Sequence, residues 1–427
     1  IDNMMYTSNN AFNIFCNAQG LETLNHRITV EVDRLISGEV APQHPSHATE
    51  SDLLRRTTPL KLMLRSVHRL MQASGTVDAL RNLIDSDLPK SLLKIFHHVD
   101  KMGASVFALA IHVTAAFVHN EPTSLSIIQE MKLPDALYDA LEHNRQASFE
   151  ILSAVPNAIG AFCLNAAGMD LVVQRREVLG RLVNNCADPA YRDILRERDN
   201  ATFLGTSLDE LARHHPPLKP ILLESLAALL KDLVEQGQTA AVFNKWEPAK
   251  YRLMTVEDVT RRAEEDAKKQ AEGKGDVKDD APVVSMSEPD ETRPEVDAAT
   301  SFAIKAADEK STKKDDNQIE ITIDIVAQLM QGLFHNPQLG KDFLAQDGLK
   351  LVLDIYGSPS LRNSFATSAT AERLHIVLRH LAEANLTKVL NGLVESVRGV
   401  MDTCRGLWDS GMQNSYLSPM IPALGES

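Results

Sequence analysis

Apolar residues recur along most of the chain at the spacing of an α-helix. Between Leu53 and Leu70 the apolar residues include Leu60, Leu64 and Val67 at spacings of three or four, which predicts an amphipathic helix that leads to a break at Gly75. From Ala104 to Val118 almost every residue is apolar, and a helix without a polar face is typical of one buried between neighbours. That run is shorter than the roughly 20 residues that span a bilayer, so it predicts a buried helix and no membrane contact.

Prolines predict where these helices begin and end. Pro122 cannot continue the buried helix, and it biases the residue before it away from the helical region. The next helix is expected to run from residue 123 or 124 to residue 131. Leu133-Pro134 then opens another helix, with proline in the first turn, where its missing N–H costs nothing.

Two further helices are predicted between residues 207 and 237. The stretch from Ser207 to Glu210 has the spacing of a capping box, which predicts a short helix that begins there and ends at His214-His215. Pro220 begins a strong helix with apolar residues as far as Leu233, and Gly237 is expected to close it.

One sequence pattern, which we call the phrase, recurs along the chain. It consists of a polar segment that contains asparagine and interrupts the helices, a short apolar stretch, and the Leu-rich start of a helix. It occurs at residues 15–24 and 162–171, and in a longer form at residues 334–352. Leu88-Pro89 and Leu133-Pro134 lie 45 residues apart in the same register. A repeat of this length is typical of armadillo or HEAT arrays, whose helix pairs bury their apolar faces by stacking. The sequence therefore predicts an all-α, armadillo/HEAT-like α-solenoid, which offers a long surface and no preformed reaction pocket.

The character of the sequence changes between residues 262 and 318, where charges of both signs alternate and few residues are apolar. Such a segment cannot recover the entropy lost on ordering, so we expect a disordered charged linker. A regulatory segment or a contact for basic partners are alternatives, but a solvated linker between two parts of a solenoid fits the composition better. The expected organisation is a first solenoid part at 1–261, the linker at 262–318, a continued solenoid at 319–408 and a tail at 409–427.

Order is expected to resume at Ile319, although the first residues of this part are ambiguous. Ile319, Ile321 and Ile323 alternate as they would in a strand, whereas the apolar residues that follow have helical spacing. Further helices are predicted at residues 349–356, 371–384 and 386–401.

The acidic composition limits the classes of partner. The net charge is −14 and the isoelectric point is near 5.5, which argues against direct binding of nucleic acid, because phosphate neutralisation needs clustered Lys and Arg. An acidic surface favours basic protein partners through long-range attraction. The alternative is that the charge only keeps the protein soluble, and this interpretation is the simpler one.

Cysteine and histidine give no catalytic or metal-binding pattern. Cys16, Cys163, Cys186 and Cys404 are too far apart for a C-x-x-C motif and too sparse for a disulfide framework, so a reducing compartment is expected. Cys163 and Cys186 lie in apolar contexts and are predicted to be inert buried thiols. The adjacent pairs His97-His98 and His214-His215 suit metal binding poorly, because neighbouring helical residues point about 100° apart. His112 is predicted to be a core histidine satisfied by a backbone carbonyl.

The remaining candidates also have a structural explanation. The Gly273-Lys274-Gly275 stretch lacks the glycine spacing and the hydroxyl residue of a phosphate-binding loop. His375 with Arg379, and Arg373 with His380, share helix faces that we interpret as solvated. We therefore expect no catalytic residue, no cofactor-binding residue and no metal ligand in this chain.

Several short segments of the chain resemble sequences of one protein family. FVHNEPTS at residues 117–124, ILSAVPNAIGAFCLN at 151–165, GLFHN at 332–336, FATS at 365–368 and LAEAN at 381–385 carry the resemblance. They are similar to the N-terminal armadillo-like region of the giant HECT-type ubiquitin ligases, the family that includes mammalian Mule and its fungal counterparts. The similarity extends over nearly the whole chain except the charged linker.

The resemblance implies a segment of a much longer ligase, and the start at Ile1 fits an excised fragment. In this family the HECT domain at the far C-terminus carries ubiquitin on a cysteine, and none of the four cysteines here matches that motif. The expected function is a non-catalytic scaffold that recruits protein substrates and contacts other regions of the parent ligase, in the cytoplasm and nucleus. The alternative is an armadillo-type adaptor for transport or assembly with no link to ubiquitin.

Overall fold

The computed structural model describes residues 14–38, 50–72, 86–143, 146–243, 317–358, 360–361 and 363–409. Every regular element in these ranges is a helix, which confirms the predicted all-α class. The α-helices are α3 (Gly20–Ser37), α4 (Glu50–Gln72), α6 (Leu88–His97), α7 (Val99–Met102), α8 (Ala104–Asn120), α9 (Ser124–Glu130), α10 (Leu133–His143), α11 (Phe149–Phe162), α12 (Ala166–Gln174), α13 (Glu177–Asn184), α14 (Arg192–Arg196), α15 (Asn200–His214), α16 (Lys219–Phe243), α19 (Asn317–Leu333), α20 (Pro337–Ala345), α21 (Gly348–Tyr356), α22 (Ala369–Ala384) and α23 (Leu386–Asp409). Short 3₁₀ helices lie at Pro189–Tyr191, Glu197–Asp199, Pro216–Leu218 and Asn363–Thr367.

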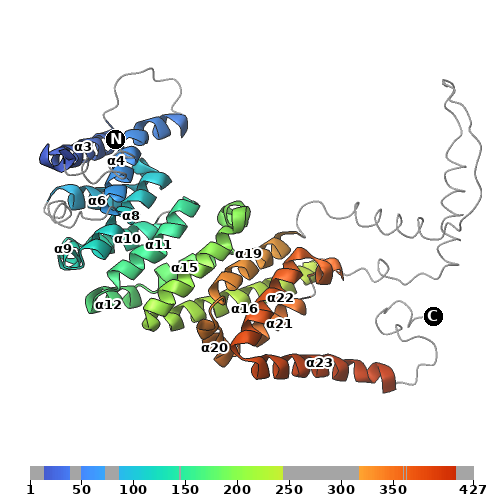
Figure 1. The fold of residues 1–427 in the computed structure, drawn as a ribbon. Coiled ribbons are helices and arrows are strands. Elements are labelled where there is room, and N and C mark those ends of the chain that lie inside the picture. Colours follow the sequence, from blue (N-terminus) through green and yellow to red (C-terminus); the bar gives the residue numbers. More distant parts are fainter. Residues whose placement is uncertain are drawn as a thin grey trace, which may run out of the picture. The chain divides into compact units, whose positions relative to one another are not determined.

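Backbone contacts divide the chain into two units, one formed by residues 1–238 with 318–393 and the other by residues 239–317 with 394–427. In the first unit the long helices α4, α8, α11 and α15 pack one after another in chain order (Figure 1). Helices α3, α6, α10 and α13 form a second row in the same order. Contacts of α3 with α4 and of α6 with α8 join the two rows. Consecutive helices stacked in this way are what the repeating sequence predicts.

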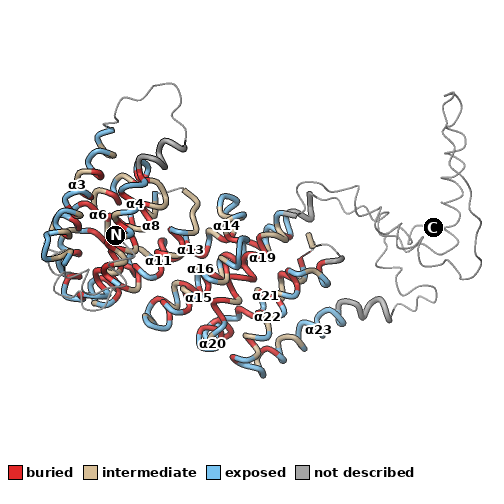
Figure 2. Tube along the Cα trace, turned by 45° about the horizontal axis from the view of Figure 1, so that its top comes forward, coloured by how far each residue is buried: buried red, intermediate tan, exposed pale blue. Residues whose placement is uncertain are grey.

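Helix α8 is buried as its composition predicts. Phe107, Ile111 and Val118 have no more than 1% of their surface exposed, and Figure 2 shows the burial running along α4, α8 and α11. The 45-residue repeat is also explained, because Leu88-Pro89 and Leu133-Pro134 begin α6 and α10, which pack against each other. The predicted helix at residues 123 or 124 to 131 is confirmed as α9.

Asparagine caps the helix after the break at two of the three occurrences of the phrase, whereas at residues 15–24 the N-cap residue of α3 is Gln19 and no side chain caps the helix. The Oδ1 atom of Asn165 accepts a hydrogen bond from the backbone N–H of Gly168 (2.7 Å), and the Oδ1 atom of Asn336 accepts one from Gln338 (3.2 Å). Asn385 caps the next helix in the same way through Lys388 (3.1 Å). These side chains satisfy donors that the first turn of a helix leaves free, which explains the asparagine at these three positions.

Two predicted helix boundaries are wrong. The capping box at Ser207 does not begin a helix, because α15 runs without interruption from Asn200 to His214 and Ser207 donates its hydroxyl to the carbonyl of Phe203. Gly237 does not close α16, which continues to Phe243. A Cβ atom at Gly237 would lie 2.1 Å from the Oγ atom of Ser358, so this glycine allows close packing inside a helix.

Residues 1–238 and residues 318–393 belong to the same unit, and helices from the two stretches pack together. Gly205 in α15 and Gly332 in α19 bring two backbones together: a Cβ atom at either glycine would lie 2.1 Å from a carbonyl oxygen of the other helix, that of Leu329 or Thr202. Lys219 in α16 also reaches Asp342 in α20 (3.6 Å). Helices α15 and α16 therefore pack against α19 and α20 within the first unit.

The Ile-rich start of the second part is helical, which removes the ambiguity at residues 319–323. Helix α19 already begins at Asn317, two residues before the predicted order. The predicted disordered linker otherwise lies outside the described residues, as do Gly75, Gly273-Lys274-Gly275 and all of the predicted tail except its first residue. The helices predicted at 349–356, 371–384 and 386–401 are confirmed as α21, α22 and α23.

Candidate interaction surface

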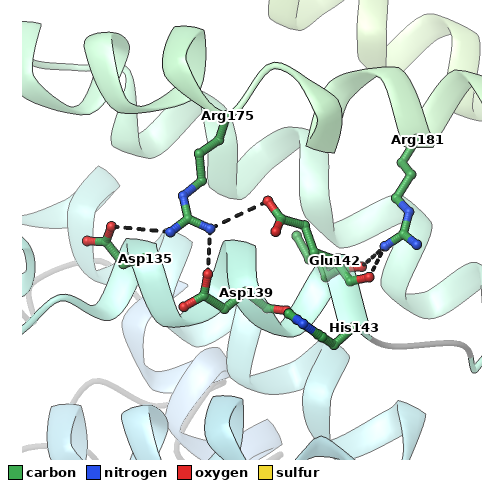
Figure 3. A network of polar contacts seen from close by, with 7 residues as sticks. Asp135, Asp139, Glu142, His143, Arg175 and Arg181 are labelled. Carbon is green, nitrogen blue, oxygen red and sulfur yellow. Dashed lines mark hydrogen bonds and ion pairs between the residues drawn. The ribbon is translucent and has the colours of Figure 1, made fainter.

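A charged network joins α10 to the end of α12. Arg175 follows the last residue of α12, and its Nη1 atom lies 2.5 Å from Oδ1 of Asp139 and 3.4 Å from Oε1 of Glu142. Its Nη2 atom lies 3.9 Å from Oδ1 of Asp135. Figure 3 shows the guanidinium group between the three carboxylates, which share one face of α10 because they are four and three residues apart. The hydrogen bond to Asp139 and the charge of these carboxylates raise the pKa of Arg175.

A second arginine holds the end of α10. The guanidinium group of Arg181 in α13 donates to the carbonyl oxygens of Leu141 (3.0 Å) and Glu142, as Figure 3 also shows. The last carbonyl groups of a helix have no partner inside the helix and carry a partial negative charge. Arg181 in α13 therefore pairs with the free carbonyl groups at the C-terminal end of α10 and offsets their partial negative charge.

These contacts border two hollows on the surface of the first unit. The larger one, about 650 Å³, lies between α10, α13 and α16, and the small residues Gly180, Ser225 and Ala228 are part of its lining. The other, about 490 Å³, lies between α6, α7 and α10. The linings of both hollows include His143, at the end of α10. We call these two hollows together the α10 groove.

Carboxylates dominate the charged lining of the α10 groove. They are Asp100, Asp139, Glu142, Glu177 and Glu224, against the arginines Arg176 and Arg181. Arg176 and Glu224 are 3.8 Å apart, but their side chains are 64% and 60% exposed, so this ion pair is weak. A groove that is wide, open and lined by charged side chains from three repeats suits a protein segment better than a small substrate.

The described cysteines have the environment of unreactive thiols. Burial raises the pKa of both Cys163 and Cys186 to about 12, so each thiol is protonated at neutral pH. Burial, with a smaller effect from Glu22, also raises the pKa of Cys16. The predicted burial of Cys163 and Cys186 is confirmed, and because the thiolate is the nucleophile, the raised pKa values agree with the prediction of unreactive thiols. The side chain of Cys404 lies outside the described residues.

The histidines differ from the predictions in one respect. His112 is half-buried rather than part of the core, and its ring lies 5.4 Å from that of His68 instead of meeting a backbone carbonyl. The members of the adjacent pairs have separate environments: His98 contacts the carbonyl of Lys94, and burial lowers the pKa of His215. Within the part of the chain that the structure describes, no three His, Cys, Asp or Glu side chains come together as a metal site.

The solvated-face interpretation of α22 is wrong for two residues. Arg373 pairs with Asp324 of α19, a carboxylate only 8% exposed that also accepts hydrogen bonds from Thr370 and Gln328. His380 is half-buried, and its ring contacts that of His335. The other two predicted residues are on the surface: His375 stacks on Tyr356, and Arg379 forms an exposed ion pair with Glu383.

Sequence reasoning did not find the two arginine networks, although a signal for each exists. Asp135, Asp139 and Glu142 share one face of a helix, which indicates a shared cationic partner. Asp324 is the one charged residue in the mostly apolar run at residues 321–330, and a charge in a buried helix indicates a buried partner. None of the described helices is long and apolar enough to cross a membrane.

Comparison with known proteins places the chain in a family. The sequence profile described as Domain of Unknown Function (DUF913) matches residues 1–364. The chain belongs to the DUF913 family. This match includes both parts of the stack, α3 to α16 and α19 to α21, together with the α10 groove.

Similar proteins in fungi, animals and plants are all ubiquitin ligases by name. E3 ubiquitin-protein ligase ptr1 of Schizosaccharomyces pombe is 31% identical over 260 residues, which are 59% of this chain and 8% of that protein. E3 ubiquitin-protein ligase HUWE1 of Mus musculus is 34% identical over 192 residues (43% of this chain, 4% of that protein). E3 ubiquitin-protein ligase UPL2 of Arabidopsis thaliana is 25% identical over 423 residues (92% and 10%). The resemblance to giant ubiquitin ligases is thus confirmed, and the chain spans a tenth or less of the length of these relatives.

Proposed function

We propose that this chain is a non-catalytic scaffold and substrate-recruiting segment of a large HECT-type E3 ubiquitin-protein ligase. The observation that carries the proposal is the similarity to E3 ligases that are more than nine times longer than the matched segment. The transferase domain then lies elsewhere in the parent chain. A stack of helices with an open groove across several repeats is suited to hold a protein, because repeat arrays bind along extended surfaces.

The described cysteines support the non-catalytic role. Ubiquitin transfer by a HECT-type enzyme passes through a thioester on a cysteine, and such a cysteine needs a lowered pKa and access to its partner. Burial acts in the opposite direction on Cys163 and Cys186, whose pKa it raises to about 12. We therefore assign substrate recruitment to this chain and ubiquitin transfer to another part of the parent ligase.

We further propose that the recruited proteins include basic ones. Residues 262–318 contain ten Lys and Arg and sixteen Asp and Glu, a net charge of −6, so the remainder of the chain carries −8 of the total −14. The acidity is therefore not confined to the charged segment, and five carboxylates line the α10 groove. This distribution argues against the view that the acidic residues only keep the protein soluble. The partners that we propose for the chain are protein substrates and other regions of the parent ligase. We propose a location in the cytoplasm and nucleus, and no binding to nucleic acid or membranes.

An adaptor for transport or assembly remains the second candidate, but no specific observation favours it. Every one of the relatives named above is called an E3 ubiquitin-protein ligase. An adaptor unrelated to ubiquitin would be expected to resemble proteins of other functions as well.

The test uses the full-length parent ligase with Glu177→Gln and Glu224→Gln, which remove two charges from the α10 groove. The matched control carries Asp170→Asn and Asp193→Asn, which remove two charges from exposed positions outside the groove. Ubiquitination of a basic client should fall in the groove variant and stay unchanged in the control, while thioester formation is equal in all three proteins. Equal client ubiquitination in the groove variant and the control would argue against recruitment through this groove.

Salt dependence separates the charged segment from the helical surface. A chain that lacks residues 262–316 should still bind a basic peptide more tightly than a neutral one at low salt. The preference should fall as salt rises, because exposed charges are screened over about 8 Å at physiological ionic strength. Loss of the preference on deletion would assign the attraction to the charged segment instead.

A further inference from the structure

Two histidine rings from neighbouring long helices lie next to each other in the first unit. His68 is in α4 and His112 is in α8, and their ring centroids are 5.4 Å apart with the planes inclined by 35°. Both side chains are half-buried, so solvent and small ions can reach them. Helices α4 and α8 pack along each other, which fixes the two backbones that carry the rings.

This separation fits two imidazoles bound to one metal ion. Zinc–nitrogen bonds are about 2.0–2.1 Å long, and a ring centroid lies about 1.1 Å behind the coordinating nitrogen, so each centroid is about 3.2 Å from the metal. At the tetrahedral angle, two such centroids are about 5.2 Å apart. The observed 5.4 Å agrees with that value, so the spacing of the two rings is compatible with one shared metal ion.

Gln72 supplies a third donor on the same side of α4. It follows His68 by four residues, and its side-chain amide lies 3.5 Å from the Nε2 atom of His68. Ligands four residues apart on one helix point in the same direction, as paired ligands in helical metal sites do. Rotation of the glutamine amide by half a turn presents its oxygen instead of its nitrogen to an ion beside Nε2.

The protonation state of both rings is the one that binds metals. Burial lowers the pKa of His68 to about 4, with a smaller contribution from His112, and burial also lowers the pKa of His112. Both imidazoles are therefore neutral near pH 7, and metal binding requires no proton to be displaced. The charge of Glu150 in α11 acts in the opposite direction on the pKa of His112, but the effect of burial is larger.

We propose that His68, His112 and Gln72 form a binding site for a divalent transition metal of the zinc class that links α4 to α8. Water completes the coordination of the ion. Two imidazoles and an amide oxygen, with no thiolate, suit Zn²⁺, Ni²⁺ and Cu²⁺, whereas Mg²⁺ and Ca²⁺ prefer sets of oxygen ligands. The proposal is independent of ubiquitin transfer, and it adds a contact between the first two long helices of the stack.

Isothermal titration of the 427-residue chain with ZnCl₂, after treatment with EDTA and dialysis, tests the proposal. We expect one ion to bind per chain with saturation, and we expect His68→Asn or His112→Asn to weaken binding by about tenfold or more. His97→Asn is the matched control, because His97 is an exposed histidine outside the pair. Circular dichroism before titration establishes that each variant is folded.

Copper provides a readout that does not depend on the stability of the variants. With CuSO₄ as the probe, the electron paramagnetic resonance spectrum of the wild-type chain should show two coordinating nitrogens, and one in each single variant. The proposal is overturned if the wild-type chain shows no saturable zinc binding. It is also overturned if the double variant His68→Asn, His112→Asn binds zinc as tightly as the wild type, or if His97→Asn is the change that removes binding.

Discussion

Replacing Gly205 with alanine should loosen the joint between α15 and α19, because the added methyl group has no space. A Cβ atom at this position would lie 2.1 Å from the carbonyl oxygen of Leu329, whereas non-bonded heavy atoms rest roughly 3.5 Å apart. The obstacle is backbone, so it cannot turn aside as a flexible side chain would. The two helices must therefore separate by roughly 1 Å along the contact.

The size of the effect follows from two opposing contributions. Inserting a methyl group into a packed contact costs about 1–3 kcal/mol, and occasionally more when the backbone has to move. Alanine in place of glycine within a helix stabilises the helix by up to about 1 kcal/mol, because alanine has the higher helix propensity. We therefore expect Gly205→Ala to lower the free energy of unfolding by about 2 kcal/mol. Gly332→Ala should behave alike, and the double variant should cost less than the sum, because both glycines belong to one contact.

Urea unfolding followed by circular dichroism measures this change. The matched control is Gly399→Ala, also within a helix, where a Cβ atom would meet nothing within 4 Å. The same substitution should there raise stability by about 0.5–1 kcal/mol. Repeat arrays lose cooperativity when an interface weakens, so Gly205→Ala should also broaden or split the transition. A stabilisation equal to that of Gly399→Ala would refute the close backbone contact.

Three further predictions concern buried groups. Arg373→Leu leaves the carboxylate of Asp324 buried without its cation and should cost about 2–3 kcal/mol in urea unfolding, whereas adding Asp324→Leu should recover part of that loss. Burial lowers the pKa of His68 to about 4, so as the pH falls the unfolded chain takes up a proton at this histidine before the folded chain does. The free energy of unfolding should therefore fall by about 2–3 kcal/mol between pH 6.5 and pH 4. In EDTA, His68→Gln should flatten this pH dependence, and an unchanged slope would contradict the lowered pKa of His68. The thiols of Cys163 and Cys186, with pKa values of about 12, should react with iodoacetamide at neutral pH only after denaturant is added, as peptide mass analysis would show.

The sequence was sufficient for features that depend on local patterns. The apolar run at residues 104–118 predicted a buried helix because its burial follows from composition alone. The Leu-Pro pairs at residues 88 and 133 predicted two equivalent helices, because proline at the first turn marks a helix start wherever it occurs. Both signals are local, and both correspond to described helices that pack together.

The failures occurred where packing overrides a local signal. Ser207 and Glu210 match a capping box, yet Leu204, Leu208 and Leu211 form one buried stripe that keeps α15 continuous through them. Gly237 is a frequent kind of helix stop, but here its lack of a side chain makes room for Ser358. A motif therefore indicates a boundary only when the apolar periodicity also ends there.

The contacts between residues far apart in the chain could not be predicted from one sequence. Arg373 and Asp324 are 49 residues apart, and Arg175 and Asp139 are 36 apart. Which charges meet depends on the register of one helix against another, and that register is set by the packed apolar faces rather than by the charged residues themselves. The sequence does not reveal the α10 groove for the same reason, since its lining comes from five helices.

The most direct test of the scaffold account is a pair of ubiquitin assays on the parent ligase with and without this chain. Deleting the segment that corresponds to residues 14–409 should leave ubiquitin thioester formation by the parent intact and should strongly reduce ubiquitination of its clients. The 427-residue chain alone should form no reducible thioester when given activating enzyme, conjugating enzyme and ubiquitin. A thioester on the isolated chain, or full client ubiquitination by the deleted parent, would contradict the account.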